Sequence, residues 1–265
     1  MVTRVVFWGV SESLQNYFYL AAGAAVLIFL LGLWSRISIW TAGSDDGEFS
    51  GYGTWDFIVF AVKSFFSRNC ILARKSFGLA AYRGVMLLFI IWGFSVLFLG
   101  TALLTVHHYS LSFLVGKIYL LYSFALDLAG LLLLIGLLIA IARRYLVNEV
   151  RQVTSREDLF LLYLLLFIVL SGFAVEGMRL AVLRPPNMDY SYGGVLFSYL
   201  MGLTGIDRAV DYVVIWGVHV ASVLFLIAYL PFSKFFHVFA SQVSVAAAED
   251  RYGQDCASQV HYTAF

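Results

Sequence analysis

The sequence predicts an all-α fold, a polytopic membrane helical bundle with about five transmembrane helices. The composition is the first indication, since 62% of the residues are hydrophobic, only 12% are charged and the mean hydropathy is +0.87. A water-soluble domain cannot hide that much apolar surface. The second indication is a set of five apolar stretches, each near the roughly 20 residues that cross a bilayer. The lipid bilayer is therefore the expected surrounding. The net charge of +1 predicts no nucleic-acid partner.

The apolar stretches place the spans along the chain. The fourth is short by itself over Leu159–Val175, and we expect it to continue to Arg179, whose long side chain would snorkel to the interface. The first lacks a small-residue cleavage site, which predicts a retained helix rather than a removed signal peptide. The segment Arg184–Asp189 predicts a turn. We expect one five-helix domain over residues 1–240, followed by a cytoplasmic tail over 241–265, with spans at about 17–40, 85–106, 119–141, 159–179 and 212–231.

The distribution of basic residues predicts the orientation. Twelve of the 17 Lys and Arg residues fall between the first and second spans, between the third and fourth, or after the fifth. Such residues mark the cytoplasmic side. We therefore expect a multi-pass protein of the cytoplasmic membrane with its N-terminus outside and its C-terminus inside. The twelve residues are Arg36, Lys63, Arg68, Arg74, Lys75, Arg83, Arg143, Arg144, Arg151, Arg156, Lys234 and Arg251.

Four of the five histidines lie at or near the ends of two predicted spans. His107 and His108 close the second span, and His219 and His237 belong to the fifth. A haem held by two histidines sits between two helices of a bundle in this way. His219 and His237 are 18 residues apart, roughly 27 Å of helix, so they cannot bind the same haem. His107 or His108 would meet His219 on the outer side. The alternative is that each histidine simply lies among the lipid headgroups.

The two cysteines bear on the cofactors of the chain. Cys70 and Cys256 are far apart and lack the spacing of a cluster-binding motif. A single chain holds an iron–sulfur cluster through several closely spaced cysteines. Any such cluster is therefore expected on a partner subunit.

Several short motifs together resemble a known family. The segment 219–239, HVASVLFLIAYLPFSKFFHVF, resembles the last span of the gamma subunit of respiratory nitrate reductase and of the cytochrome b subunit of heterodisulfide reductase. Of the two, the heterodisulfide reductase subunit is the more similar. The likeness extends through Trp40-Thr41-Ala42-Gly43, Arg83-Gly84-Val85-Met86, Ala142-Arg143-Arg144-Tyr145, Ser171-Gly172-Phe173 and Glu176-Gly177-Met178-Arg179, in the same order.

The resemblance implies a five-helix cytochrome b with one or two haem b groups. Such a subunit would pass electrons between a quinone-like membrane carrier and a cytoplasmic iron–sulfur subunit. Its further partners would be other membrane or periplasmic subunits of a respiratory complex. Substrate catalysis would take place on a partner subunit, and His219 and His237 match the two haem ligands of the fifth span.

The second span departs from the family pattern. A histidine follows the Val-Met pair in the heterodisulfide reductase subunit, whereas Leu87 follows it here. Residues 87 and 108 are 21 apart, about 31 Å of helix, so the missing ligand is the inner partner of His237. Helical phase favours His108 over His107 as the outer ligand. The inner haem is then absent, or has one histidine, or takes another ligand such as Met86 or His261.

Four charged residues in or near the spans complete the set of candidates. Asp127 and Glu176 would be proton acceptors at a quinone site, because intramembrane acids are costly and usually functional. Arg179 would pair with a haem propionate or with Glu176, and Lys234 would be a propionate partner or an interfacial anchor. The alternative for the acids is a purely structural pair with Arg179.

Two other classes of function compete with electron transfer. One is a membrane anchor or scaffold with a reduced or lost haem complement, for which Leu87 is the motivating residue. The other is a transporter, which would show inverted repeats or broken helices. The sequence shows neither, so electron transfer is the favoured function.

Overall fold

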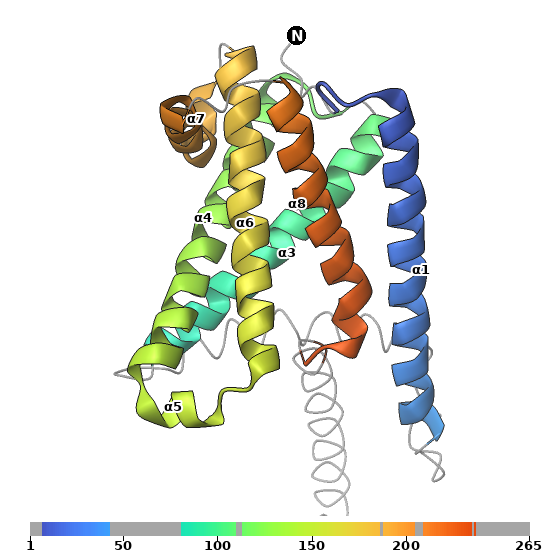
Figure 1. The fold of residues 1–265 in the computed structure, drawn as a ribbon, viewed down its shortest axis with the longest axis vertical. Coiled ribbons are helices and arrows are strands. Elements are labelled where there is room, and N and C mark those ends of the chain that lie inside the picture. The colour runs from blue at the N-terminus through green and yellow to red at the C-terminus, as the bar shows by residue number, and fades with distance from the viewer. Residues whose placement is uncertain are drawn as a thin grey trace, which may run out of the picture.

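The computed structural model describes residues 7–42, 81–109, 113–185, 188–204, 209–234 and 236. Within these ranges every regular element is helical, and five helices are long and apolar enough to cross a membrane. They are α1 (Glu12–Ala42), α3 (Ala81–Tyr109), α4 (Gly116–Leu146), α6 (Arg156–Leu183) and α8 (Ala209–Tyr229). Figure 1 shows them running along one direction, with α3 crossing the others obliquely. The predicted all-α, multi-pass membrane fold is confirmed.

Each long helix begins before its predicted apolar stretch, because polar residues at its start continue the helix beyond the hydrocarbon. Helix α6 shows how such an end is stabilised. The Ser155 hydroxyl accepts a hydrogen bond from the Asp158 backbone N–H, and the Asp158 carboxylate accepts one from the Ser155 N–H at 2.9 Å. This reciprocal capping satisfies two backbone donors that the first turn of a helix leaves free.

Helices α4 and α6 form the centre of the bundle. Leu133 and Leu137 of α4 are fully buried, in one core cluster with residues of α3, α6 and α8. Helix α3 approaches α4 closely at Gly93, where an added Cβ would lie 2.7 Å from the Cβ of Leu133. Gly136 of α4 makes a similar approach to α3 beside Ile90. Small residues allow this close packing, which is a main source of helix association in lipid.

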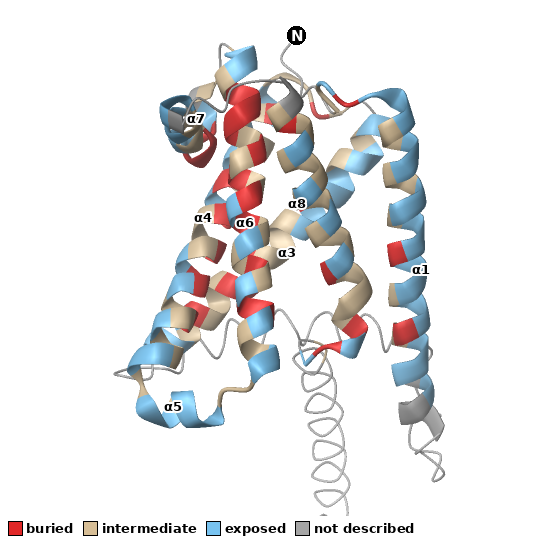
Figure 2. Ribbon diagram, viewed as in Figure 1, coloured by how far each residue is buried: buried red, intermediate tan, exposed pale blue. Residues whose placement is uncertain are grey.

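Helices α1 and α8 bury little of their surface, with α1 at the edge of the bundle and α8 between α1 and α6 (Figure 1). Helix α8 packs along α6 and α1, and α1 also contacts the short η2 (Leu230–Phe232), where Pro231 and Phe232 lie beside Gly32. Among the described helices, α3 packs mainly along α4 and shares no extended contact with α8. Figure 2 shows the resulting contrast, with α1 mostly exposed and many more buried residues along α6.

Four short elements complete the described chain. Helix α5 (Asn148–Val153) joins α4 to α6, and η1 (Met188–Tyr190) leads into α7 (Tyr192–Thr204), while η2 follows α8. Helix α7 is too short to span a bilayer. In Figure 1 it is seen nearly end-on, so its axis runs across the bundle, at the end where the N-terminus lies. The sequence pattern did not predict α7.

Several predictions fall outside the described residues. They concern the histidines His237 and His261, the cysteines Cys70 and Cys256, and the tail over 241–265.

Candidate functional site

His219 lies in the middle of α8 and faces α6. The helix begins ten residues earlier, at Ala209, so the imidazole lies about 15 Å from that end and deeper than the sequence indicated. Its Nδ1 lies 2.9 Å from the Ser171 hydroxyl of α6. Gly172 leaves room for the ring, because an added Cβ would lie 3.2 Å from the His219 Cε1.

Ser171 has two polar neighbours, and they bear on the tautomer of His219. The Ser171 hydroxyl lies 3.1 Å from the Ile168 carbonyl oxygen, which can only accept, and 2.9 Å from His219 Nδ1, where either atom can be the donor. In the arrangement that satisfies both contacts, the hydroxyl donates to Ile168 and accepts from His219 Nδ1–H, which leaves a lone pair on Nε2. A neutral imidazole held by its Nδ1–H in this way presents Nε2 as a metal ligand.

His107 has a different role at the turn between α3 and α4. Its Nδ1 accepts a hydrogen bond from the Leu114 backbone N–H at 3.1 Å, and its ring meets Phe113 edge-on. Since Nδ1 accepts, the proton of the neutral ring lies on Nε2, which then has no lone pair for a metal. Of the two neighbouring histidines, His108 is therefore the better candidate ligand, as the helical phase predicts.

His108 lies in an aromatic cluster near the ends of α1, α3 and α8. Its ring contacts Phe7 at 5.6 Å and Tyr109 at 4.9 Å between centroids. Phe7 also contacts Trp216 of α8 at 6.0 Å. Phe7 has a positive φ of 54°, which is uncommon for a residue with a side chain. Phe7 thus connects α3 with α8 at this end of the bundle.

The two candidate ligands of the outer haem have separate neighbours. His219 contacts Ser171 and Gly172, whereas His108 contacts Phe7 and Tyr109. Trp216, which Phe7 joins to His108, lies three residues before His219, about 4.5 Å along the helix. Their pairing on one iron stays a prediction.

The other end of α3 contains Met86 and Leu87. Met86 is buried in the core cluster that α3 forms with α4. Its side chain therefore packs in the α3–α4 core, although the sequence left it open as an inner ligand. Leu87 is half-buried.

Asp127 of α4 is buried and binds the start of α7. Its Oδ2 accepts a short hydrogen bond from the Gly193 backbone N–H, and the Ser191 hydroxyl and the Gly194 N–H also reach the carboxylate. The first backbone N–H groups of a helix lack partners within the helix and attract negative charge. Asp127 therefore caps a helix from a neighbouring helix. Sequence reasoning missed this role because α7 was not predicted.

Glu176 and Arg179 form an ion pair on α6. The Arg179 guanidinium donates to both carboxylate oxygens, with Nε 3.1 Å from Oε2. Tyr119 of α4 also hydrogen-bonds the guanidinium. Arg179 is only 5% exposed, and a bidentate pair is the arrangement in which a buried arginine is best satisfied. The structure thus contains the predicted Glu176–Arg179 pair, close to the start of α7.

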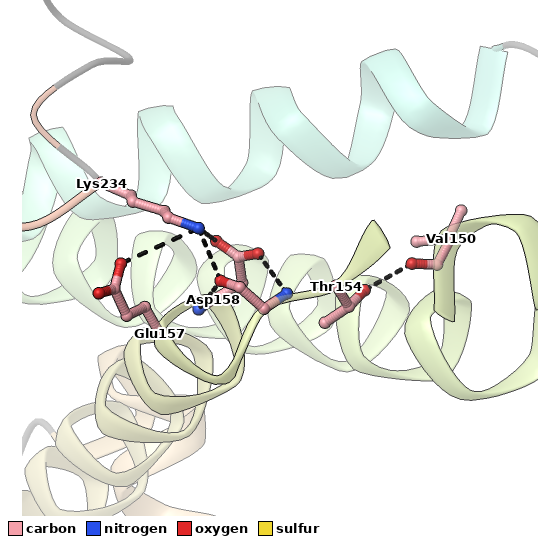
Figure 3. A network of polar contacts seen from close by, with 6 residues as sticks. Val150, Thr154, Glu157, Asp158 and Lys234 are labelled. Atoms are coloured by element: carbon pink, nitrogen blue, oxygen red, sulfur yellow. Dashed lines mark hydrogen bonds and ion pairs between the residues drawn. The ribbon is translucent and has the colours of Figure 1, made fainter. Parts of the chain in front are cut away.

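Lys234 lies at the opposite end of the bundle and contacts the start of α6. Figure 3 shows its ammonium group beside Glu157 and Asp158. Nζ donates to the Ser155 hydroxyl at 2.7 Å and lies 3.9 Å from each of the two carboxylates. The contact ties the end of α8 to the first turn of α6. In the same region, the Nε atoms of Arg143 and Arg144 are buried without a hydrogen-bond partner among the described residues.

Within the described ranges, no three His, Cys, Asp or Glu side chains gather as they do around a bound metal ion. Haem iron needs at most two protein ligands, so this result leaves the histidine candidates in place. His219, with its ring beside Ser171 and Gly172, is of a residue type that could hold such an iron.

Comparison with known proteins identifies the family. Residues 88–249 match the family described as nitrate reductase gamma subunit, and this range runs from α3 past the end of α8. The chain belongs to the nitrate reductase gamma subunit family. The match covers more than half of the chain and includes His108, Ser171 and His219. No solved structure matches this member of the family significantly.

Curated relatives of this gamma-family chain are oxidoreductases or their subunits. It is 29% identical to the EtfAB:quinone oxidoreductase of Syntrophomonas wolfei over 83% of its own length and 31% of that protein. It is 33% identical to one subunit of the dihydromethanophenazine:CoB–CoM heterodisulfide reductase of Methanosarcina mazei, over 44% of the chain and 39% of that subunit. The Methanosarcina barkeri protein of the same name is 25% identical over 91% of the chain and 95% of its own length. The chain thus spans about a third of the first two relatives.

Proposed function

We propose that this protein is the haem b-carrying electron-transfer subunit of a respiratory oxidoreductase in the cytoplasmic membrane. The observation that carries the proposal is His219 itself, a histidine in the middle of a span whose Nδ1 lies 2.9 Å from the Ser171 hydroxyl. A histidine there without a function would be costly in lipid. Family membership over α3–α8 supports the same conclusion.

The relatives support a lipid-soluble electron carrier. One is named for a quinone and the others for dihydromethanophenazine. Each name also includes a second reactant, EtfAB or the CoB–CoM heterodisulfide. By analogy, this chain exchanges electrons between a quinone-like carrier and a cytoplasmic iron–sulfur subunit. The substrate site of the complex then lies on a partner subunit.

In this proposal His219 and His108 would hold an outer haem. His237 would serve an inner haem, where Leu87 cannot be the second ligand. When bound, the haem supplies an iron that takes up and releases one electron at a time. The chain's own contribution would be to orient the His219 ring through Ser171, and to leave space beside the imidazole at Gly172.

A quinol that gives up two electrons also releases two protons, so its site needs proton acceptors. We place Glu176 and Asp127 in this role. Both carboxylates already make structural contacts. Glu176 forms an ion pair with Arg179, and Asp127 accepts a hydrogen bond from the start of α7. Whichever carboxylate accepts a proton must weaken that contact. Arg179 would then be free to pair with a haem propionate.

The opposite end of the bundle carries the basic residues expected to face the cytoplasm. Arg143 and Arg144 lie there in the last turn of α4, and both residues are partly exposed. An acidic surface of an iron–sulfur subunit would complement them. Lys234, already bonded to Ser155, would anchor this end or pair with an inner haem propionate.

A spectroscopic experiment tests the proposal. The haem b content per chain is measured by the pyridine haemochrome assay, with dithionite-reduced minus oxidised spectra, for the purified protein and two variants. His219→Ala is expected to lose the outer haem. His107→Ala is the matched control and is expected to keep it, because His107 only closes a turn. A wild-type protein without any Soret band would overturn the haem proposal.

Leu87 favours one alternative, a membrane anchor with a reduced or lost haem complement. In that case the chain would still bring its partner subunits together at the membrane, with no haem in either site. Co-purification of the partners with a haem-free chain would support it.

A further inference from the structure

Helix α7 differs from the usual helix at a membrane surface. Its 13 residues, YGGVLFSYLMGLT, contain no charged side chain. A helix that lies on a membrane normally has a charged or strongly polar face toward water and an apolar face toward lipid. Helix α7 has no such polar face, so water is a poor neighbour for either of its sides.

One side of α7 is exposed and almost entirely apolar. Its large residues lie at positions i, i+4, i+7, i+8 and i+11, which fall on one helical face. Tyr199 is 71% and Leu203 is 84% exposed. This set, called the α7 stripe below, consists of Tyr192, Leu196, Tyr199, Leu200 and Leu203.

The other side of α7 is fixed on α6. Gly177 of α6 lies against Phe197, and the rings of Phe173 and Phe197 stack at 5.3 Å. An added Cβ at Gly194 would lie 2.8 Å from a Leu180 methyl group. Together with the Asp127 cap, these contacts set the rotation of α7. These contacts therefore turn the α7 stripe away from the rest of the protein.

The α7 stripe continues a surface that already faces lipid. Tyr192 meets Phe124 of α4 edge-on at 6.2 Å. On α4 the exposed residues Leu121 and Leu128 lie within four residues of Phe124, and on a membrane span such residues face acyl chains. Helix α7 lies across the bundle near the end of the spans. Tyrosines are enriched at that depth.

We propose that α7 is embedded in the leaflet on the N-terminal side, parallel to the membrane plane, with its stripe in contact with lipid. The partner of this surface is the bilayer itself, at the boundary between headgroups and acyl chains. Asp127 is then a positioning residue that holds α7 at this depth. The proposal does not depend on the haem or on the electron carrier.

Site-specific fluorescence tests the proposal on the full chain in proteoliposomes. In a Cys70→Ser, Cys256→Ser background, a nitrobenzoxadiazole label is attached at Tyr199→Cys or, independently, at Leu203→Cys. Quenching is measured with aqueous iodide and with lipids that carry a spin label near the headgroup or near the bilayer centre. Two control positions are Leu128→Cys, exposed near the middle of α4, and Arg151→Cys, exposed on α5.

Shallow spin-labelled lipid is expected to quench both α7 labels most strongly, and iodide is expected to quench them several-fold less than the Arg151→Cys label. The Leu128→Cys label should respond best to the deep spin label. Iodide quenching equal to that at Arg151→Cys would place the stripe in water and overturn the proposal. Protection from both iodide and lipid quenchers would mean that protein covers the stripe, which also overturns it.

Discussion

Helices α4 and α6 bury far more of their surface in the protein than α1 and α8 do. In the most apolar 18-residue window, 39% of α4 and 33% of α6 is buried, against 11% of α1 and 6% of α8. Lipid is as apolar as leucine, so α1 and α8 need few protein contacts to remain in the membrane. His219 is on α8. The candidate ligand site therefore lies beside the spans that bury the least surface against the rest of the protein.

The largest expected difference between these regions comes from matched leucine truncations. Leu137→Ala in α4 removes a side chain with 0% exposure and is expected to reduce the free energy of unfolding by about 2 kcal/mol or more. Leu27→Ala in α1, where the side chain is 58% exposed, should change it by less than about 0.5 kcal/mol. Reversible unfolding in mixed micelles measures both. Equal losses would contradict the contrast between centre and periphery.

The next largest loss of stability is expected when Asp127 of α4 can no longer cap α7. Asp127→Ala leaves the Gly193 N–H without its acceptor and is expected to reduce stability by about 1–2 kcal/mol. Asp127→Asn keeps an acceptor oxygen, so its thermal unfolding should remain close to that of the wild type.

The same pair of variants separates the structural role of Asp127 from the proposed proton transfer. If Asp127 accepts a proton from a quinol, Asp127→Asn should fold normally and lose quinol-dependent haem reduction. Full reduction kinetics in this variant would remove Asp127 from the quinone site and leave Glu176 as the candidate acceptor.

Ser155 joins α6 to the end of α8, because its hydroxyl caps α6 and also accepts a hydrogen bond from Lys234. Ser155→Ala removes both contacts and is expected to cost about 1 kcal/mol, the usual value of a helix cap. Thermal unfolding in nanodiscs measures the loss. An unchanged midpoint would show that the first turn of α6 is held by its neighbours alone.

An effect no larger than that of Ser155→Ala is expected for Lys234→Met. The side chain is 46% exposed and its ammonium group lies 3.9 Å from each carboxylate, so the pairs contribute at most about 1 kcal/mol, less at high salt. Unfolding at low and high ionic strength measures this contribution. A loss larger than that of Ser155→Ala would indicate a further anionic partner for Lys234, such as a haem propionate.

The long spans were predictable because each combines sufficient length with an almost charge-free sequence. The five predicted ranges all lie within the observed helices, with η2 completing the last. Helix α7 was missed because 13 apolar residues are too few to span a bilayer. Ser191 before it and Gly205 after it are residue types that mark helix ends. The uncharged run Tyr192–Thr204 between them is the signal that could have revealed α7.

The candidate site was less predictable than the fold. The 3.6-residue period favours His108 over His107, and the hydrogen bond from Leu114 to His107 agrees with this choice. The contact between Ser171 and His219 joins residues 48 apart, and nothing in the local sequence specifies such a pair. The depth of His219 depends on where α8 begins, and helix ends are the least certain feature of any sequence pattern.

The pairing of Ser171 with His219 also fixes when the site can form during synthesis. A ribosome produces Ser171 well before His219, and α8 is the last long helix of the described chain to emerge. Helices α4 and α6 can pack before then, because both are already in the membrane. Any group that binds His219 must therefore be delivered after most of the bundle has assembled, which makes cofactor insertion a late step in the biogenesis of this protein.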